Sequence, residues 1–180
     1  IIILLLTAAW LATFSRVTSG VGGSSFLPPS PSPQLVCWSL ASMIGLLALM
    51  VLGGYVSGTE AAFHCNAEWP LCNGTLLPQG NGAGIQVSHR LMAVVVGLVV
   101  LGFWLASLRE RRSQRGVSQL ASLLLLLFII QVLLGAATQW TVLADWSRVV
   151  HLTAGALTWV TAILVVGLLV YRVAWFPSMS

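Results

Sequence analysis

The stretch IQVSHRLMAVVVGLVVLGFWLASL, residues 85–108, decides how this chain folds. It is apolar from Leu91 onward, and it exceeds the length of about 20 residues that a helix needs to cross a bilayer. Three further apolar runs lie at about 35–57, 117–140 and 147–172. Because a backbone in lipid must satisfy its own hydrogen bonds, each run is predicted to be a helix. The sequence therefore predicts an all-α membrane protein, an antiparallel bundle of four transmembrane helices.

The composition agrees with this fold class. Hydrophobic residues make up 58% of the chain, charged residues only 7%, and the mean hydropathy is +0.96. In a soluble domain roughly a quarter of the residues are charged. Lipid must therefore solvate much of the surface of this protein. The net charge of +4 would indicate nucleic acid in a soluble protein. Here the basic residues fall at the ends of the apolar runs, which indicates membrane topology and excludes a nucleic-acid partner.

The start of the chain differs from the rest. Residues 1–16 form an apolar run that ends at Arg16 and lacks the basic segment that precedes the apolar part of a signal peptide. We expect them to be the end of a helix that begins upstream, in a longer protein. Residues 17–34 are rich in Gly, Ser and Pro, the composition of a linker. The predicted units are thus the helix end 1–16, a cytoplasmic linker 17–34 and a four-helix domain 35–176.

Six of the eight arginines predict the orientation. These six fall on one side of an up-and-down bundle, and the positive-inside rule makes that side cytoplasmic: Arg16, Arg109, Arg111, Arg112, Arg115 and Arg172. Loop 109–116 is then cytoplasmic and loop 58–84 lies outside. We expect a multi-pass protein of the inner or plasma membrane.

Cys65 and Cys72 lie in the predicted outer loop. Disulfides persist on the oxidising side of bacterial membranes, so the two are predicted to form a bridge that pins the loop over the bundle end. Two free thiols are the alternative. Cys37, with no partner in sight, is predicted to be a small buried apolar residue.

Two of the three histidines, His89 and His151, lie about one turn into predicted spans that both run inward. Ionisable residues inside a membrane indicate function by default. Two imidazoles at one depth on facing helices form a bis-histidine haem site, with the iron as the metal they bind. The alternatives are hydrogen bonds to neighbouring helices, or a zinc site, for which only Asp145 and Glu68 could supply further ligands.

Each of these histidines has an arginine nearby. Arg90 follows His89, and Arg148 precedes His151 by three residues, which places it on the same helix face. Arginine binds carboxylates through two parallel hydrogen bonds, so both are predicted to hold the propionates of a haem.

Four strings resemble the haem A synthase family of cytochrome oxidase assembly proteins. GGYVSGTEAAFHCNAEWPLCNG (53–74) is similar to its outer loop, and QVSHRLMAVVVG (86–97) to a histidine helix. QVLLGAATQW (131–140) is similar to its third helix, and DWSRVVHLTAGAL (145–157) to the second histidine helix. Together they cover about residues 35–172 in the family's order.

The resemblance implies two pseudo-symmetric four-helix halves, of which this chain would be the carboxy-terminal one. One half would hold haem O, which the enzyme oxidises to haem A, and the other a resident haem b. The substrate half commonly has a glutamate three residues before its first histidine, whereas this chain has Gln86. A glutamine cannot exchange a proton, so the resemblance assigns His89 and His151 to haem b.

The partners implied are membrane lipid, haem, the missing half or a second copy, and haem O synthase or a larger membrane complex. The main alternative is a non-catalytic haem-b subunit that passes electrons in, or braces, a respiratory or photosynthetic complex. A disulfide-handling quinone reductase would need two dithiol pairs, and only one outer pair exists here. A structural protein without a cofactor also fits the fold.

Overall fold

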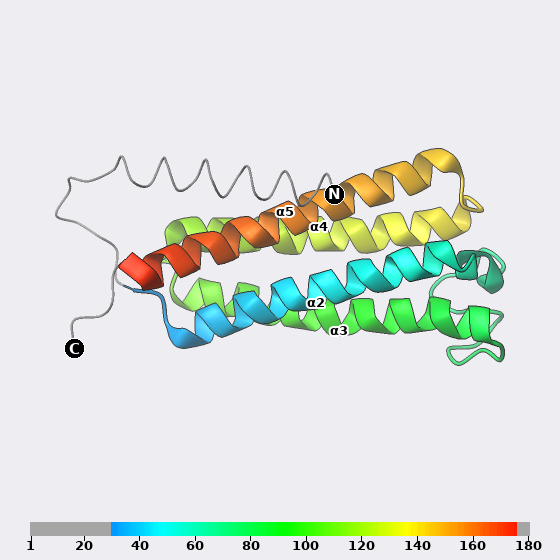
Figure 1. Ribbon diagram of the computed structural model, residues 1–180, viewed down its shortest axis with the longest axis horizontal. Coiled ribbons are helices and arrows are strands. Elements are labelled where there is room, and N and C mark those ends of the chain that lie inside the picture. Colours follow the sequence, from blue (N-terminus) through cyan, green and yellow to red (C-terminus); the bar gives the residue numbers. More distant parts are fainter. Residues whose placement is uncertain (1–29, 176–180) are drawn as a thin grey trace.

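The computed structural model describes residues 30–175 as four long helices and one short 3-10 helix (Figure 1). The elements are α2 (Pro33–Gly58), η1 (Ala61–Cys65), α3 (Asn81–Arg109), α4 (Arg115–Trp140) and α5 (Asp145–Trp175). All four long helices are long and apolar enough to cross a membrane. The prediction of an all-α, multi-pass membrane protein is confirmed. The predicted helix end 1–16 and most of the linker 17–34 lie outside the described residues.

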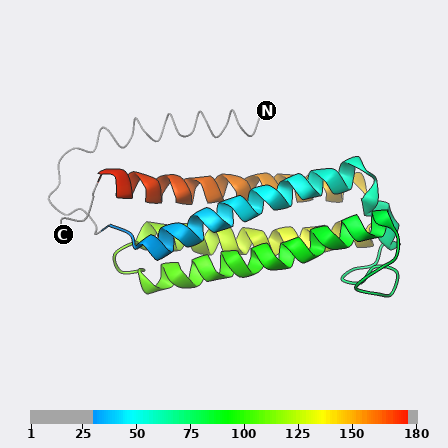
Figure 2. The same ribbon diagram turned by 60° about the horizontal axis from the view of Figure 1, so that its bottom comes forward.

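The helices form a four-sided bundle in which each packs against two neighbours. The neighbouring pairs are α2–α3, α3–α4, α4–α5 and α5–α2, so α3 and α5 face each other across a diagonal. In Figure 2, α2 runs between α5 and α3. Successive helices are antiparallel (Figure 1).

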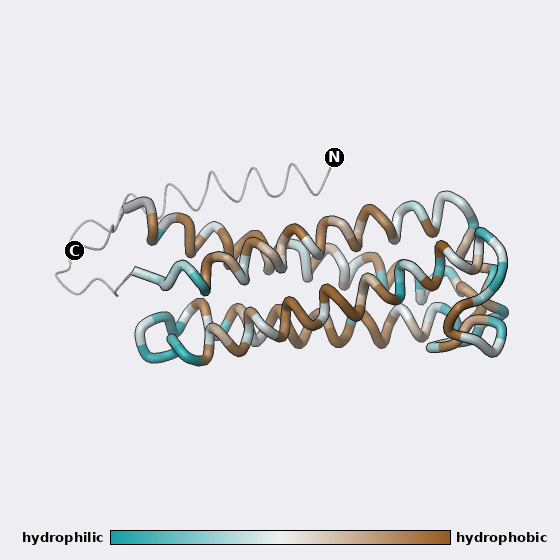
Figure 3. Tube along the Cα trace, turned by 90° about the horizontal axis from the view of Figure 1, so that it is seen from below, coloured by the Kyte–Doolittle hydropathy of each residue, from teal (hydrophilic) through white to brown (hydrophobic). Residues whose placement is uncertain are grey.

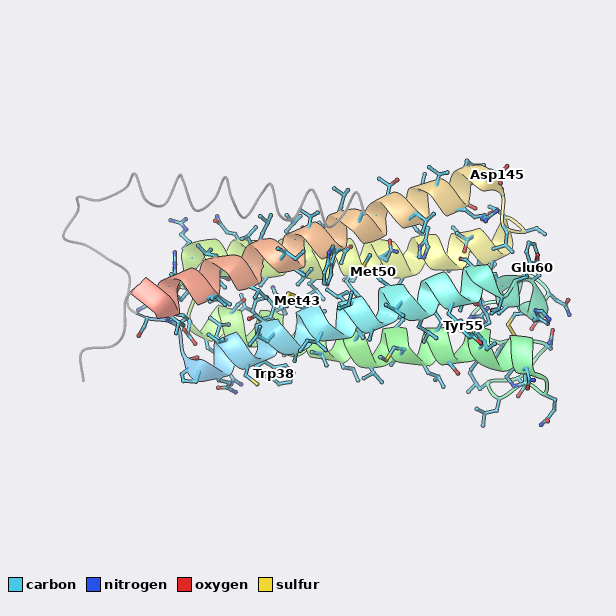
Figure 4. The ribbon with its side chains drawn as sticks, viewed as in Figure 1. Trp38, Met43, Met50, Tyr55, Glu60 and Asp145 are labelled. Atoms are coloured by element: carbon cyan, nitrogen blue, oxygen red, sulfur yellow. A yellow bond between two sulfur atoms is a disulfide. The ribbon has the colours of Figure 1, made fainter. Side chains whose placement is uncertain are left out.

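The two ends of the bundle differ, and we name them by their contents (Figure 1). The arginine end holds the turn 110–114, the start of α2 and the last turn of α5. The loop end holds the segment 59–80 with η1 and the turn 141–144. In Figure 4, Glu60 and Asp145 lie at the loop end, whereas Trp38 lies toward the arginine end. In Figure 3 the polar residues gather at the two ends and the apolar ones between them.

Each helix begins a few residues before its predicted start, most clearly α3, which starts at Asn81 rather than 85. Gly80 explains this start. Its φ of 101° is a left-handed conformation that glycine adopts without strain. Its carbonyl then accepts a hydrogen bond from Gly84 N at 3.0 Å, which closes the first turn of the helix.

A cluster of buried apolar side chains from all four helices packs the bundle from the arginine end to its middle. Its members are Leu35, Leu46, Val96, Val100, Phe103, Ala106, Val117, Ala121, Leu124, Phe128, Ala162, Val165 and Leu169. The members nearest the loop end are Leu46, Val96, Phe128 and Ala162. Toward the loop end this packed core stops.

Polar contacts hold the arginine end together. Ser32 caps α2 by accepting from Leu35 N at 3.2 Å, and its hydroxyl donates to Glu110, the residue that ends α3. The backbone N of Ser32 also donates to Glu110 Oε2 at 3.2 Å. A guanidinium nitrogen of Arg172 donates to Gln114 Oε1. All four helices are thus fixed to one another at this end.

The prediction for Cys37 is wrong, because its side chain is exposed on α2. In a membrane helix an apolar thiol is as well solvated by lipid as by protein, so a small apolar residue need not face the core.

Candidate functional site

The two histidines lie on the diagonal pair of helices, toward the loop end. His89 is eight residues after the first residue of α3, and His151 is six residues after the first residue of α5. Both side chains are half-buried. Val96, the nearest core residue on α3, lies about two turns deeper than His89. The histidines therefore occupy the part of the bundle that the packed core does not reach.

This part of the bundle also holds every buried side-chain polar atom that lacks a hydrogen-bond partner among residues 30–175. Those atoms are Gln86 Oε1, His89 Nδ1, Arg90 Nε, Gln131 Oε1 and His151 Nδ1. Buried polar atoms are satisfied in the large majority of cases, and each exception calls for an explanation. Five exceptions at one level of one bundle indicate a site built for a polar or metal-containing ligand.

A haem fits these residues. Two neutral imidazoles on opposite helices can supply the two axial ligands of one iron. A zinc ion fits less well, since no three His, Cys, Asp or Glu side chains come together anywhere in the described part of the chain.

Gln86 is 5% exposed and lies one turn before His89 on α3. Its side chain can hydrogen-bond but does not take up or release a proton. The two acidic residues of the loop 59–80 do not supply the carboxylate that Gln86 lacks. Glu60 is exposed, and Glu68 accepts a hydrogen bond from Gly74 N at 2.7 Å.

The sequence did not single out Gln131, although it lies within one of the family-like strings. Its Nε2 is 3.4 Å from Nε2 of His151, and it packs against Gly155, one turn deeper on α5. A glutamine inside a long apolar run is the signal that could have identified it.

Arg90 contacts the loop 59–80, between α2 and α3. Its Nη1 donates to the carbonyl oxygens of Pro70 and Leu71 at 2.9 and 2.6 Å, and its Nη2 to that of Glu68 at 2.9 Å. Both terminal nitrogens of the guanidinium are thus occupied by backbone. Arg90 anchors the loop in this structure, a role that the sequence did not indicate, and only its Nε is left without a partner.

Arg148 remains more accessible. Its side chain is 55% exposed and makes an ion pair of 3.7 Å with Asp145, whose side chain is 99% exposed. Such exposed pairs contribute little free energy, so the guanidinium can exchange this partner for another carboxylate.

Two further contacts close the loop end. Cys65 and Cys72 are both fully buried, their sulfur atoms lie 2.08 Å apart, and they pack against Ala83 and Val87 at the start of α3. The rings of Trp69 and Trp140 meet edge to face with centroids 5.9 Å apart, which joins the loop to the end of α4. His64, by contrast, is exposed on η1.

Comparison with known proteins identifies the family of this chain. The family model described as cytochrome oxidase assembly protein matches residues 1–163, most of the chain. Several relatives bear the name haem A synthase.

The chain belongs to the haem A synthase family.

A haem A synthase of Lysinibacillus sphaericus is 28% identical over 138 residues, which are 76% of this chain and 45% of that protein. One of Alkalihalophilus pseudofirmus is 31% identical over 107 residues, 57% of this chain and 35% of that protein. A protoheme IX farnesyltransferase of Halobacterium salinarum is 36% identical over 123 residues, 68% of this chain and 26% of that protein. The chain thus spans less than half the length of these relatives, and the predicted membership of the haem A synthase family is confirmed.

Proposed function

We propose that this chain is the haem b-binding half of a membrane oxidoreductase that converts haem O to haem A. The observation that carries the proposal is the pair His89 and His151 on the diagonal helices, at the level where the unpartnered buried polar atoms of the described residues gather. The two imidazoles would hold the iron of the haem. A bound haem b would supply one-electron redox chemistry.

The residues around the histidines have separate tasks in this proposal. Arg148 binds a propionate at the loop end, and the Nε of Arg90 offers a second donor there. Arg90 also holds the outer loop closed over the site through three carbonyls. The disulfide Cys65–Cys72 fixes that loop to α3, so that water is kept from the ligands.

Gln86 supports the assignment to the haem b half. The chain contains four acidic residues, and none lies beside the histidines inside a span: Glu60, Glu68, Glu110 and Asp145. A carboxylate is the side chain that takes up and releases protons in such a site, and a glutamine is not. Oxidation of haem O therefore requires residues from the other half of the protein or from a second copy.

The lack of an acidic residue beside the histidines also favours a second candidate function. This function is a non-catalytic haem-b subunit that passes electrons in a larger respiratory or photosynthetic complex. The farnesyltransferase relative shows that a segment like this one also occurs in a protein named for a different reaction of protohaem. That relative also supports haem O synthase as a partner.

The orientation is part of the proposal. The arginine end carries Arg109, Arg111, Arg112 and Arg115, and we place it in the cytoplasm. The loop end then faces outward from the inner or plasma membrane.

Purification of the chain in detergent after co-expression with a haem O-forming enzyme tests these assignments. The pyridine haemochrome spectrum of the wild type should show haem b, and His89→Ala or His151→Ala should each lose most of it. Full haem content in both variants would refute the ligand assignment. Haem A formed only when the other half is also present supports the oxidoreductase, whereas haem b alone under both conditions supports the electron-transfer subunit.

A further inference from the structure

Two glycines lie beside the two histidines in the same way. A Cβ built on Gly53 of α2 would lie 3.1, 3.7 and 3.8 Å from Cε1, Nδ1 and Nε2 of His89. A Cβ built on Gly135 of α4 would lie 3.2, 3.8 and 4.0 Å from the same three atoms of His151. The same edge of the imidazole thus faces a glycine in both places.

The repetition extends to the helices that carry these residues. Gly53 lies five residues before the end of α2, and Gly135 five residues before the end of α4. Each glycine-bearing helix is followed in the chain by the helix of its histidine, so the bundle consists of two equivalent hairpins. The residues around the glycines differ, GGYVSG in one hairpin and GAATQW in the other. The close glycine–imidazole contact is therefore what the hairpins have in common.

The missing side chains leave room for the rings. Carbon atoms attract most at about 3.5–4.0 Å, so a methyl group at either glycine would press on Cε1 of the imidazole. The ring would then have to shift or turn away. Nδ1 of both rings has no hydrogen-bond partner among the described residues, so no hydrogen bond at that atom fixes either ring.

We propose that Gly53 and Gly135 are positioning residues, which allow His89 and His151 to take their ring orientations because neither glycine has a Cβ. The consequence for a ligand rests on the proposed function, whereas the packing itself does not. Each glycine leaves room for one ring against its helix, and a side chain in its place would displace that ring.

A double-mutant cycle tests the contact without haem. Gly53→Ala should lower the melting temperature of the purified chain, because the new methyl group meets His89. The loss should disappear when His89→Ala is also present, since the conflict is then removed. Gly54→Ala is the matched control, because a Cβ at Gly54 meets nothing within 4 Å. An equal effect of Gly53→Ala with and without the imidazole would overturn the proposal.

The second hairpin gives an independent test of the same kind. Gly135→Ala should act only when His151 is present, with Gly116→Ala as the control in α4, where a Cβ also meets nothing within 4 Å. If neither glycine variant folds, the double variants with His89→Ala or His151→Ala should restore folding. Failure of these double variants to fold would also count against the proposal.

The haem-loaded chain shows the effect on ligation. The electron paramagnetic resonance g values of a low-spin haem depend on the angle between its two imidazole planes. Gly53→Ala and Gly135→Ala should shift these g values and the midpoint potential, whereas Gly54→Ala and Gly116→Ala should not. Unchanged g values in a haem-containing Gly53→Ala chain would overturn the inference alone. A wild-type chain that binds no haem would overturn the proposed function. The double-mutant cycle would then still test the packing of the glycines against the histidines.

Discussion

At the scale of single residues, Gln131 has the most unusual environment in the bundle. It interrupts an apolar run that extends from Leu123 to Leu134, and its side chain reaches His151. Its Oε1 is buried without a partner, so part of the hydrogen-bonding capacity of this side chain is unused at this position. Such a position favours a role at the site over a role in folding.

Replacing this glutamine should therefore affect binding more than stability. Gln131→Leu removes one weak hydrogen bond and one unsatisfied oxygen, so we expect the free energy of unfolding to change by about 1 kcal/mol or less. Because the amide no longer competes for Nε2 of His151, a haem titration should show tighter binding. Gln119→Leu, an exposed position near the start of the same helix, is the control. Weaker haem binding in Gln131→Leu would show instead that the amide contacts the ligand.

Arg90 gives a second prediction at this scale. Arg90→Lys keeps the charge but cannot hold three carbonyls with one planar group, so we expect a loss of about 2 kcal/mol in stability. The outer loop should become sensitive to limited proteolysis at the same time. Arg148→Lys, whose ion pair is exposed, should change neither quantity. Equal proteolysis of the two variants would argue against the loop anchor.

At the scale of elements, the turn between α4 and α5 contains backbone strain. Val142 and Leu143 have φ values of 53° and 59°, in the left-handed region that residues other than glycine rarely adopt and that β-branched residues such as valine avoid most. Leu143 N donates to Thr138 O at 2.8 Å, so the strained turn still closes the end of α4. The strained φ values thus allow α4 and α5 to be connected by only a few residues.

A glycine in this turn should relieve the strain. Val142 is 72% exposed, so Val142→Gly gives up little packing, and we expect it to raise the unfolding free energy by about 1 kcal/mol. Thermal unfolding in detergent measures the change. Thr141→Gly should act in the opposite direction, because Thr141 has an ordinary φ of -89° and its hydroxyl donates to Ala137 O at 2.8 Å. Destabilisation by Val142→Gly would mean that the turn is not strained.

At the scale of the whole molecule, the arginines predict which end faces the cytoplasm. In a cysteine-free background, Ser113→Cys in the turn 110–114 should react with an impermeant thiol reagent only after the membrane is opened. Asn73→Cys in the outer loop should react in intact cells. The reverse pattern would contradict the orientation.

The fold was largely predictable from the sequence, and the site only in part. Four apolar runs and the arginines between them define the spans, because length and composition alone decide whether a helix crosses a membrane. His89 and His151 face each other only because α3 and α5 lie diagonally in the bundle. This arrangement depends on how the four helices pack together, which the sequence of a single apolar run does not determine. The contacts of Arg90 are with backbone carbonyls, which every residue has, so they leave no sequence signature.

The two histidines lie within about two turns of the loop end, and this depth determines how their proposed haem would respond to the membrane potential. Moving one charge across the whole bilayer against 100 mV requires about 2.3 kcal/mol. An electron exchanged with a partner at the loop end would cross little of that field. An electron delivered from the arginine end would cross most of that field. The membrane potential would therefore affect electron transfer from the arginine end and hardly affect transfer from the loop end.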